Sequence, residues 1–200
     1  MSILSTGEAL QQHYGLEIPK MDSRQAIADI LKSAYREWAG GFRSDSTESA
    51  NNVTDQIRRL PGIAILEYGK YGADYDYGCA HFVFGTVHRQ PWARPYRELA
   101  REMFLPTDSS KFLFSFIKKA GDYALVDDPC AGNVAAYSVQ KMSPEQDLIF
   151  THFGIVQPDG SITSKLSIGP VVNHPIEVVH PSYGNYVYFL GHSAINKLAA

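Results

Sequence analysis

Two residues of this chain have the chemistry and the setting to cleave an amide bond together. Cys79 opens the segment CAHFVFGTVH, in which apolar residues recur at helical spacing. A thiol at a helix N-terminus faces unpaired backbone N–H groups and the positive end of the helix dipole, which favour the nucleophilic thiolate. His152 begins the strand-like segment HFGIVQ after a polar linker, so its imidazole could take and return the proton. The pair indicates catalysis by a cysteine nucleophile and a histidine base.

Both residues also have a plainer interpretation. Cysteine is among the most buried residue types, so Cys79 could be a small core residue, and His152 could be a core histidine. The combination of helix start, strand start and following hairpin favours the nucleophile. Cys130, in DDPCAG, lacks such a context and is interpreted as structural. Two cysteines form neither a disulfide framework nor a C-x-x-C metal motif.

The seven histidines raise the alternative of a metal site. No His-Glu-x-x-His motif and no closely spaced ligand pair occurs in the sequence. His174 and His180 with an acidic residue would be a weak ligand set. We therefore predict neither a metal nor a cofactor.

The elements that position Cys79 and His152 change in type along the chain. Helical periodicity and its stop signals predict helices over 23–39, 53–60, 79–88, 96–104 and 110–120, with loops at 43–52 and 68–78. The loop YGKYGADYDYG (68–78) could line a substrate cleft or pack beneath the nucleophile helix. After Gly121, short β-branched or aromatic segments predict strands at 123–126, 133–139, 152–157, 161–166, 176–179 and 185–190.

Helices followed by strands predict an α+β fold with an antiparallel sheet of about five strands. We expect residues 1–60 to form a helical N-terminal extension or cap. Residues 61–200 are expected to form the catalytic domain, and the two parts to make one compact unit.

The motifs together resemble the NlpC-type branch of papain-like cysteine peptidases and amidases. In that family the nucleophile opens a helix, a Pro-x-Gly-Asp strand follows, and a further strand begins His-hydrophobic-Gly-Ile. The corresponding segments here are CAHFVF, PCAGNVAAY and HFGIV, the last followed by a PDG hairpin. The tail at 161–189 is similar to a family variant with Ser-Lys-Trp-Gly, His and Tyr-Gly in that order. The resemblance covers residues 70–190.

The resemblance implies a papain-like fold with Cys79 as nucleophile and His152 as base. The backbone N–H of Cys79 would be one oxyanion donor. A third polar residue on the strand after the hairpin would orient His152. Hairpin register places Ser164 there, and His174 is the alternative.

Three positions depart from the family pattern. Gly78 stands where the family has Asp before the nucleophile, Asn133 replaces the Asp of Gly-Asp, and Leu166 replaces the Trp after Ser-Lys. Ser164 is also a weaker orienting group than the His, Asn or Gln usual in the family. These departures keep a non-catalytic binding module open as an alternative.

The resemblance implies a peptide or amide substrate, most often a bacterial cell-wall (peptidoglycan) peptide. Deamidases and acyltransferases use the same scaffold, because an acyl-enzyme can be resolved by different acceptors. The net charge of −3 and the pI of about 6.1 argue against a nucleic-acid partner.

No apolar run approaches the length of a membrane span, so we expect no membrane insertion. No N-terminal signal peptide is recognised, which predicts cytoplasmic synthesis. An enzyme acting on the cell wall would then need a signal-independent effector or phage-type export route. An effector of this kind could have an inhibitor or immunity protein as partner.

Overall fold

The computed structural model describes residues 15–18, 24–26, 28–30, 54–67, 78–90, 104–105, 108–143, 145–166 and 170–192. Within these residues the fold is α+β with mainly antiparallel strands, as the sequence predicted. Among them, no helix is both long enough and apolar enough to cross a membrane. The predicted loops at 43–52 and 68–78 lie outside the described residues, except for Gly78.

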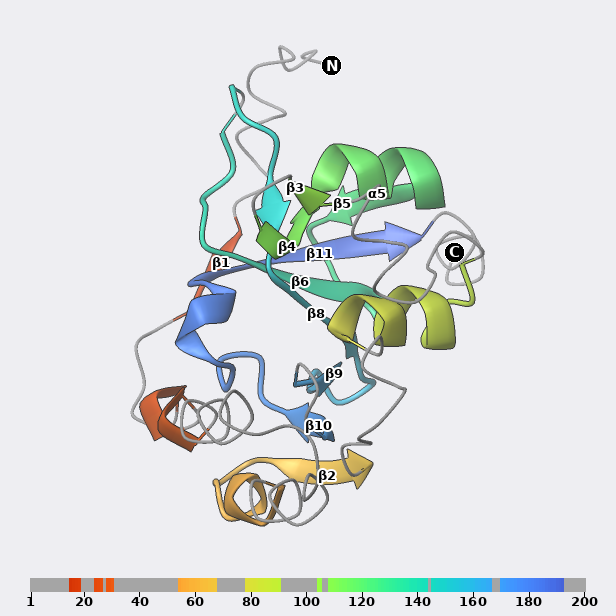
Figure 1. Cartoon of the computed structure of the whole chain (residues 1–200). Helices are drawn as coiled ribbons and strands as arrows, with labels where there is room; N and C mark the ends of the chain where they lie inside the picture. The colour runs from red at the N-terminus through yellow and green to blue at the C-terminus, as the bar shows by residue number, and fades with distance from the viewer. Residues whose placement is uncertain are drawn as a thin grey trace, which may run out of the picture.

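The main sheet forms the centre of the molecule (Figure 1). All of its pairings are antiparallel, and β11 holds both β1 and β5 along its outer edge. Its eight strands, in spatial order with β5 last, are β1 (Leu16–Glu17), β11 (Tyr186–His192), β6 (Val134–Ser138), β8 (His152–Val156), β9 (Ile162–Lys165), β10 (Val171–His174), β2 (Ala64–Glu67) and β5 (Tyr123–Val126).

A three-stranded sheet and short helices complete the described structure. The small sheet has the order β3 (Phe104–Leu105), β4 (Asp108–Leu113), β7 (Ile149–Phe150). The helices are the π-helix η1 (His81–Val87), α5 (Phe114–Gly121) and the 3-10 helix η2 (Pro181–Tyr183). Residues 24–26, 28–30 and 54–58 are also helical, which agrees with the helices predicted at 23–39 and 53–60 where these are described.

The prediction of about five strands was too low. It missed β1, whose two residues carry no periodicity, and the four-residue strand β2, which pairs with β10. The sequence also predicted a strand at 176–179. The strand in this region is instead β10 (Val171–His174), which ends just before Pro175. Both segments are rich in valine, but β10 lies between β9 and β2, so its backbone can form hydrogen bonds along both edges. Residues 176–179 instead begin with a turn, in which the Val178 N–H bonds the Pro175 carbonyl.

Two predicted helices also differ from the structure. The helix predicted at 110–120 is α5, but residues 108–113 form β4, because that segment pairs with β3 and β7. The predicted helix at 96–104 lies outside the described residues except for Phe104, which belongs to β3. Both changes reflect strand pairing with distant segments, which local periodicity does not report.

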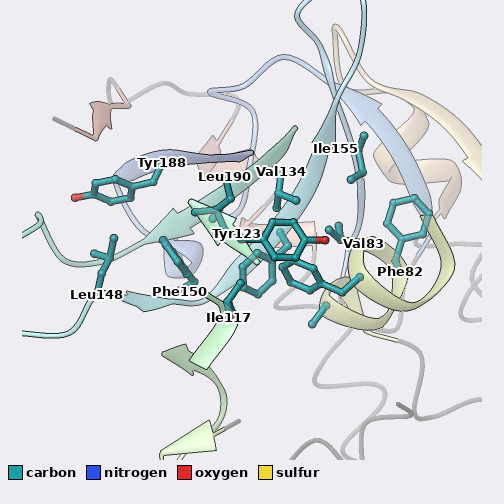
Figure 2. Close-up of a cluster of buried hydrophobic side chains, with 14 of the residues drawn as sticks. Phe82, Val83, Ile117, Tyr123, Val134, Leu148, Phe150, Ile155, Tyr188 and Leu190 are labelled. Atoms are coloured by element: carbon teal, nitrogen blue, oxygen red, sulfur yellow. The ribbon is translucent and has the colours of Figure 1, made fainter. Parts of the chain in front are cut away.

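Two of the three groups of buried side chains lie on opposite sides of the sheet around β8. One group, the helix-side core, contains Val83 of η1, Ile117 of α5 and Ile155 of β8, which Figure 2 labels. Phe84 of η1 and Phe153 of β8 belong to the same core. The second, the opposite core, is formed by Ile18, Ala135, Tyr137, Val156, Ile162, Val179 and Val187. Because successive strand residues point to opposite sides, Phe153 faces the helix-side core, whereas His152 and Val156 face the opposite core. This alternation decides what surrounds His152.

Candidate active site

Cys79 is the first helical residue before η1, as the sequence predicted. The side chain is half-buried and packs against the helix-side core. Its sulfur lies against the backbone N–H groups of Phe153, Ala80 and Cys79 itself. Phe153 directly follows His152 on β8, so the fold brings the helix start to the start of that strand.

The protonation state of Cys79 differs from the prediction. Burial raises the pKa of the thiol to about 11, although the three backbone N–H groups and Lys165 act in the opposite direction. The sequence predicted that the helix start would favour the thiolate, and the backbone N–H groups do act in that direction, but burial outweighs them. The cost of removing an anion from water exceeds the stabilisation by backbone dipoles. The resting residue is therefore a neutral thiol.

His152 is fully buried at the start of β8, with 0% of its surface exposed. Its ring stacks on Tyr183, with centroids 4.0 Å apart and planes within 5°, and also contacts Tyr137 at 5.6 Å. Among the described residues, neither ring nitrogen has a hydrogen-bond partner. Burial lowers the pKa of His152 well below its usual value, and the neighbouring His174 and His180 lower it further.

The predicted hydrogen-bonded dyad is therefore not formed. Cys79 lies against the helix-side core, whereas the His152 ring lies on the opposite side of β8, against Tyr183. The fold places Cys79 beside the residue that follows His152, because the Cys79 sulfur meets the N–H of Phe153. Strand alternation then turns the imidazole away from the sulfur.

Ser164 and His174 bond to each other rather than to His152. Ser164 Oγ lies 2.8 Å from His174 Nε2, and His174 Nδ1 lies 2.8 Å from the Pro175 carbonyl oxygen. Since a carbonyl only accepts, Nδ1 carries the proton and Nε2 accepts from the serine hydroxyl. The predicted orienting bond from Ser164 or His174 to His152 is thus absent in this structure.

This buried histidine makes stability depend on pH. Burial lowers the pKa of His174 from 6.5 to about 4. The unfolded chain therefore binds a proton first as the pH falls, and His174 contributes stability that is lost between these two values. We expect the free energy of unfolding to fall by about 3 kcal/mol through this residue from neutral pH to about pH 4. Urea unfolding at the two pH values measures the change.

His174→Gln is the matched variant, because an amide can still bond the Ser164 hydroxyl but does not titrate. Its unfolding free energy should fall less steeply with pH than that of the wild type, and the remaining slope includes His152, whose pKa is also lowered. Equal slopes for the two proteins would contradict the assignment.

Lys165 is a buried cation on the thiol's side of the sheet that the sequence interpretation did not single out. It directly follows Ser164 on β9, so it points to the other side of the sheet, and only 4% of its surface is exposed. Its ammonium lies close enough to Cys79 to lower the pKa of the thiol. A lysine within the buried strand segment SITSKL was the available signal, since lysine is rarely buried without a partner.

Removing this charge should make the thiol less reactive. In Lys165→Met, we expect the pKa of Cys79 to rise by about half a unit and alkylation at pH 9 to slow by about threefold. Iodoacetamide kinetics followed by mass spectrometry at Cys79 measure the rate. Lys118→Met, on the exposed face of α5, is the control and should react like the wild type. Equal rates for the two lysine variants would show that Lys165 does not act on the thiol.

Cys130 belongs to a tight turn rather than to this site. Its backbone N–H bonds Asn133 Oδ1 at 2.8 Å, and its thiol lies 3.4 Å from the same oxygen. The two cysteines are not joined by a disulfide. Asn133, where the resembling family has Asp, therefore fixes the turn that precedes β6. Within the described ranges, no group of three or more His, Cys, Asp or Glu side chains could hold a metal ion.

Comparisons of the chain with protein-family models, with curated proteins and with solved structures find no match. The resemblance to NlpC-type enzymes therefore depends on the motifs of the sequence. The geometry adds the adjacency of Cys79 to the start of β8 and the buried, unbonded imidazole of His152.

Proposed function

We propose that the protein is a cysteine-dependent hydrolase of amide or peptide bonds, of the papain-like NlpC type. One observation carries the proposal: the thiol of Cys79, at a helix start, meets the N–H of the residue after His152. His152 has two buried ring nitrogens with no partner among the described residues. A buried polar group without a hydrogen bond is costly, and such groups are concentrated at functional sites.

In the proposed reaction, His152 takes the proton of Cys79 as the sulfur attacks the substrate carbonyl. The backbone N–H of Cys79 stabilises the oxyanion, and the imidazolium then protonates the leaving amine. Water then attacks the resulting thioester and gives a proton to His152. The acid product is released, and His152 returns the proton to the Cys79 sulfur. Because thiol and imidazole are both neutral at rest, proton transfer accompanies attack rather than preceding it. For this step the start of β8 must rearrange when substrate binds, because the His152 side chain lies on the opposite side of the strand from the Cys79 sulfur.

The proposed substrate is a peptide or small amide, with a bacterial cell-wall peptide as the first choice by resemblance. The net charge of −3 and the apolar surroundings of Cys79 suit such a ligand better than a polyanion. Ser164 and His174 would support the site as a neutral hydrogen-bonded pair beside His152.

The test is to trap the acyl-enzyme. Full-length protein is mixed with peptidoglycan-derived peptides and quenched in acid, and the mass added to the Cys79 peptide is measured. A thioester on Cys79 that decays to free acid supports a hydrolase. Decay to a transferred amide or ester would instead indicate an acyltransferase, and release of ammonia from a glutamine side chain would indicate a deamidase.

One observation favours a second function, a binding module that retains the fold without catalysis. The resting thiol and imidazole are both neutral and are not hydrogen-bonded to each other. If peptides bind with measurable affinity but no mass is ever added to Cys79, this second function replaces the first.

A further inference from the structure

The described structure contains no hydrogen bond that could fix the direction of the His152 ring. Both ring nitrogens lack partners there, and Ser164 and His174 are bonded to each other. The ring is held instead by packing between two aromatic residues. Tyr183 lies parallel to it at 4.0 Å, whereas Tyr137 is more distant, at 5.6 Å, and tilted by 46°. Tyr183 is therefore the contact that defines the plane of the imidazole.

Tyr183 is in turn fixed to the residue before the histidine. It ends helix η2, where its N–H bonds the His180 carbonyl at 3.0 Å. Its own carbonyl accepts a hydrogen bond from Thr151 Oγ1 at 2.5 Å. The stack thus joins the start of β8 to the segment that precedes β11.

Arg24, from the N-terminal part of the chain, holds both ends of that segment. Its Nε donates to the Val179 carbonyl at 3.2 Å, and its terminal nitrogens donate to the Gly184 carbonyl at 2.6 Å and to Asn185 Oδ1 at 3.2 Å. Only 3% of its surface is exposed. In Figure 1 the helical residues 24–26 and 28–30, in red-orange, lie near the blue segment that contains η2. A buried guanidinium with three acceptors is a specific contact, because an unpaired one would be strongly destabilising.

We propose that Tyr183 is the positioning residue of His152 and that Arg24 keeps Tyr183 in place by clamping residues 179–185. This inference rests on the proposed function, in which His152 is the base. It gives the N-terminal part of the chain a role in the site, and it replaces the hydrogen-bonded third residue expected from the resemblance. The imidazole is held by stacking on the side of β8 opposite Cys79, so the start of β8 can rearrange without breaking a hydrogen bond to the ring.

The test follows the imidazole of His152 by NMR in the full chain, using ring-proton shifts across pH. Other titrating or charged groups around it are His174 on β10, His180 before η2 and Arg24, so each variant is compared at matched pH. In Tyr183→Leu we expect the His152 signals to lose their ring-current shift and the imidazole pKa to rise toward its ordinary value, because the smaller side chain leaves the ring less buried. Tyr183→Phe keeps the stacked ring and should restore both properties.

Arg24→Met tests the clamp without touching either ring, and it also serves if Tyr183→Leu does not fold. It should shift the His152 signals in the same direction as Tyr183→Leu, whereas Gln25→Met, at the exposed neighbouring position, should leave them unchanged. Unchanged His152 signals in Tyr183→Leu and Arg24→Met, or failure of Tyr183→Phe to restore them, would overturn the proposal.

The NMR readout needs no turnover, so the two proposals can fail separately. If activity requires Cys79 but the His152 signals are unchanged in Tyr183→Leu, only the positioning role of Tyr183 is refuted. Where activity is measured, Tyr183→Leu should lower kcat about tenfold and shift its pH profile while KM stays unchanged.

Discussion

Cys79→Ala is expected to lower kcat/KM for the proposed amide hydrolysis by about a thousandfold or more, because it removes the sulfur that would carry the acyl group. The loss should be equally large at all pH values, since it removes the nucleophile rather than changing its ionisation. Hydrolysis of peptidoglycan-derived peptides, followed by chromatography of the released products, measures it. The urea-unfolding midpoint should change little, because the residue is small and half-buried.

Cys130→Ala is the matched control, because it removes the other thiol of the chain, which is also half-buried. It should retain wild-type turnover and lose only the weak contact of that thiol with Asn133. Equal activity in the two alanine variants would end the assignment of Cys79 as nucleophile and leave the binding module as the better explanation.

Gly184→Ala is expected to destabilise the fold by about 3 kcal/mol or more. Gly184 has φ +108°, a conformation that L side chains rarely adopt. A Cβ there would overlap the carbonyl oxygen and carbon of Ser138, which are backbone atoms of the central strand β6. These atoms cannot move without disturbing the sheet, so the segment after η2 must shift instead. Urea unfolding measures the loss.

Gly160→Ala is the control that separates the cost of a positive φ from the cost of a steric overlap with neighbouring atoms. Gly160 also has a positive φ, +81°, but a Cβ at this position in the hairpin between β8 and β9 would meet nothing within 4 Å. We expect it to cost only about 1 kcal/mol. If both variants lose the same stability, the contact with Ser138 is not the cause. A surviving Gly184→Ala protein should also show displaced His152 signals, because Gly184 directly follows Tyr183.

The types of several elements could be predicted from the sequence because their signals are local. The helix start at Cys79 and the strand start at His152 were both confirmed, since a glycine before an apolar helical pattern and a short β-branched segment act over a few residues. The PDG hairpin between β8 and β9 was likewise recognised from its turn residues. These signals fixed the α+β class and the antiparallel order of the second half.

Strand identity near β10 and β4 depended on partners far along the chain. Val171–His174 forms a strand because it lies between β9 and β2, although the valines at 178 and 179 have the same local preference. Residues 108–113 form a strand because β3 and β7 lie beside them. Pairing with distant segments overrides local preference, because a strand gains its stability from its neighbours.

The sequence by itself determined the local setting of three residue types: a cysteine at a helix start, a histidine at a strand start, and a serine on the strand after the hairpin. Only the tertiary structure decided their charge and direction. Packing against the helix-side core raises the pKa of Cys79, alternation along β8 turns His152 toward Tyr183, and Arg24 reaches residues more than 150 positions away. Desolvation and long-range contacts have no local sequence signal, because both depend on which atoms the folded chain places around a group.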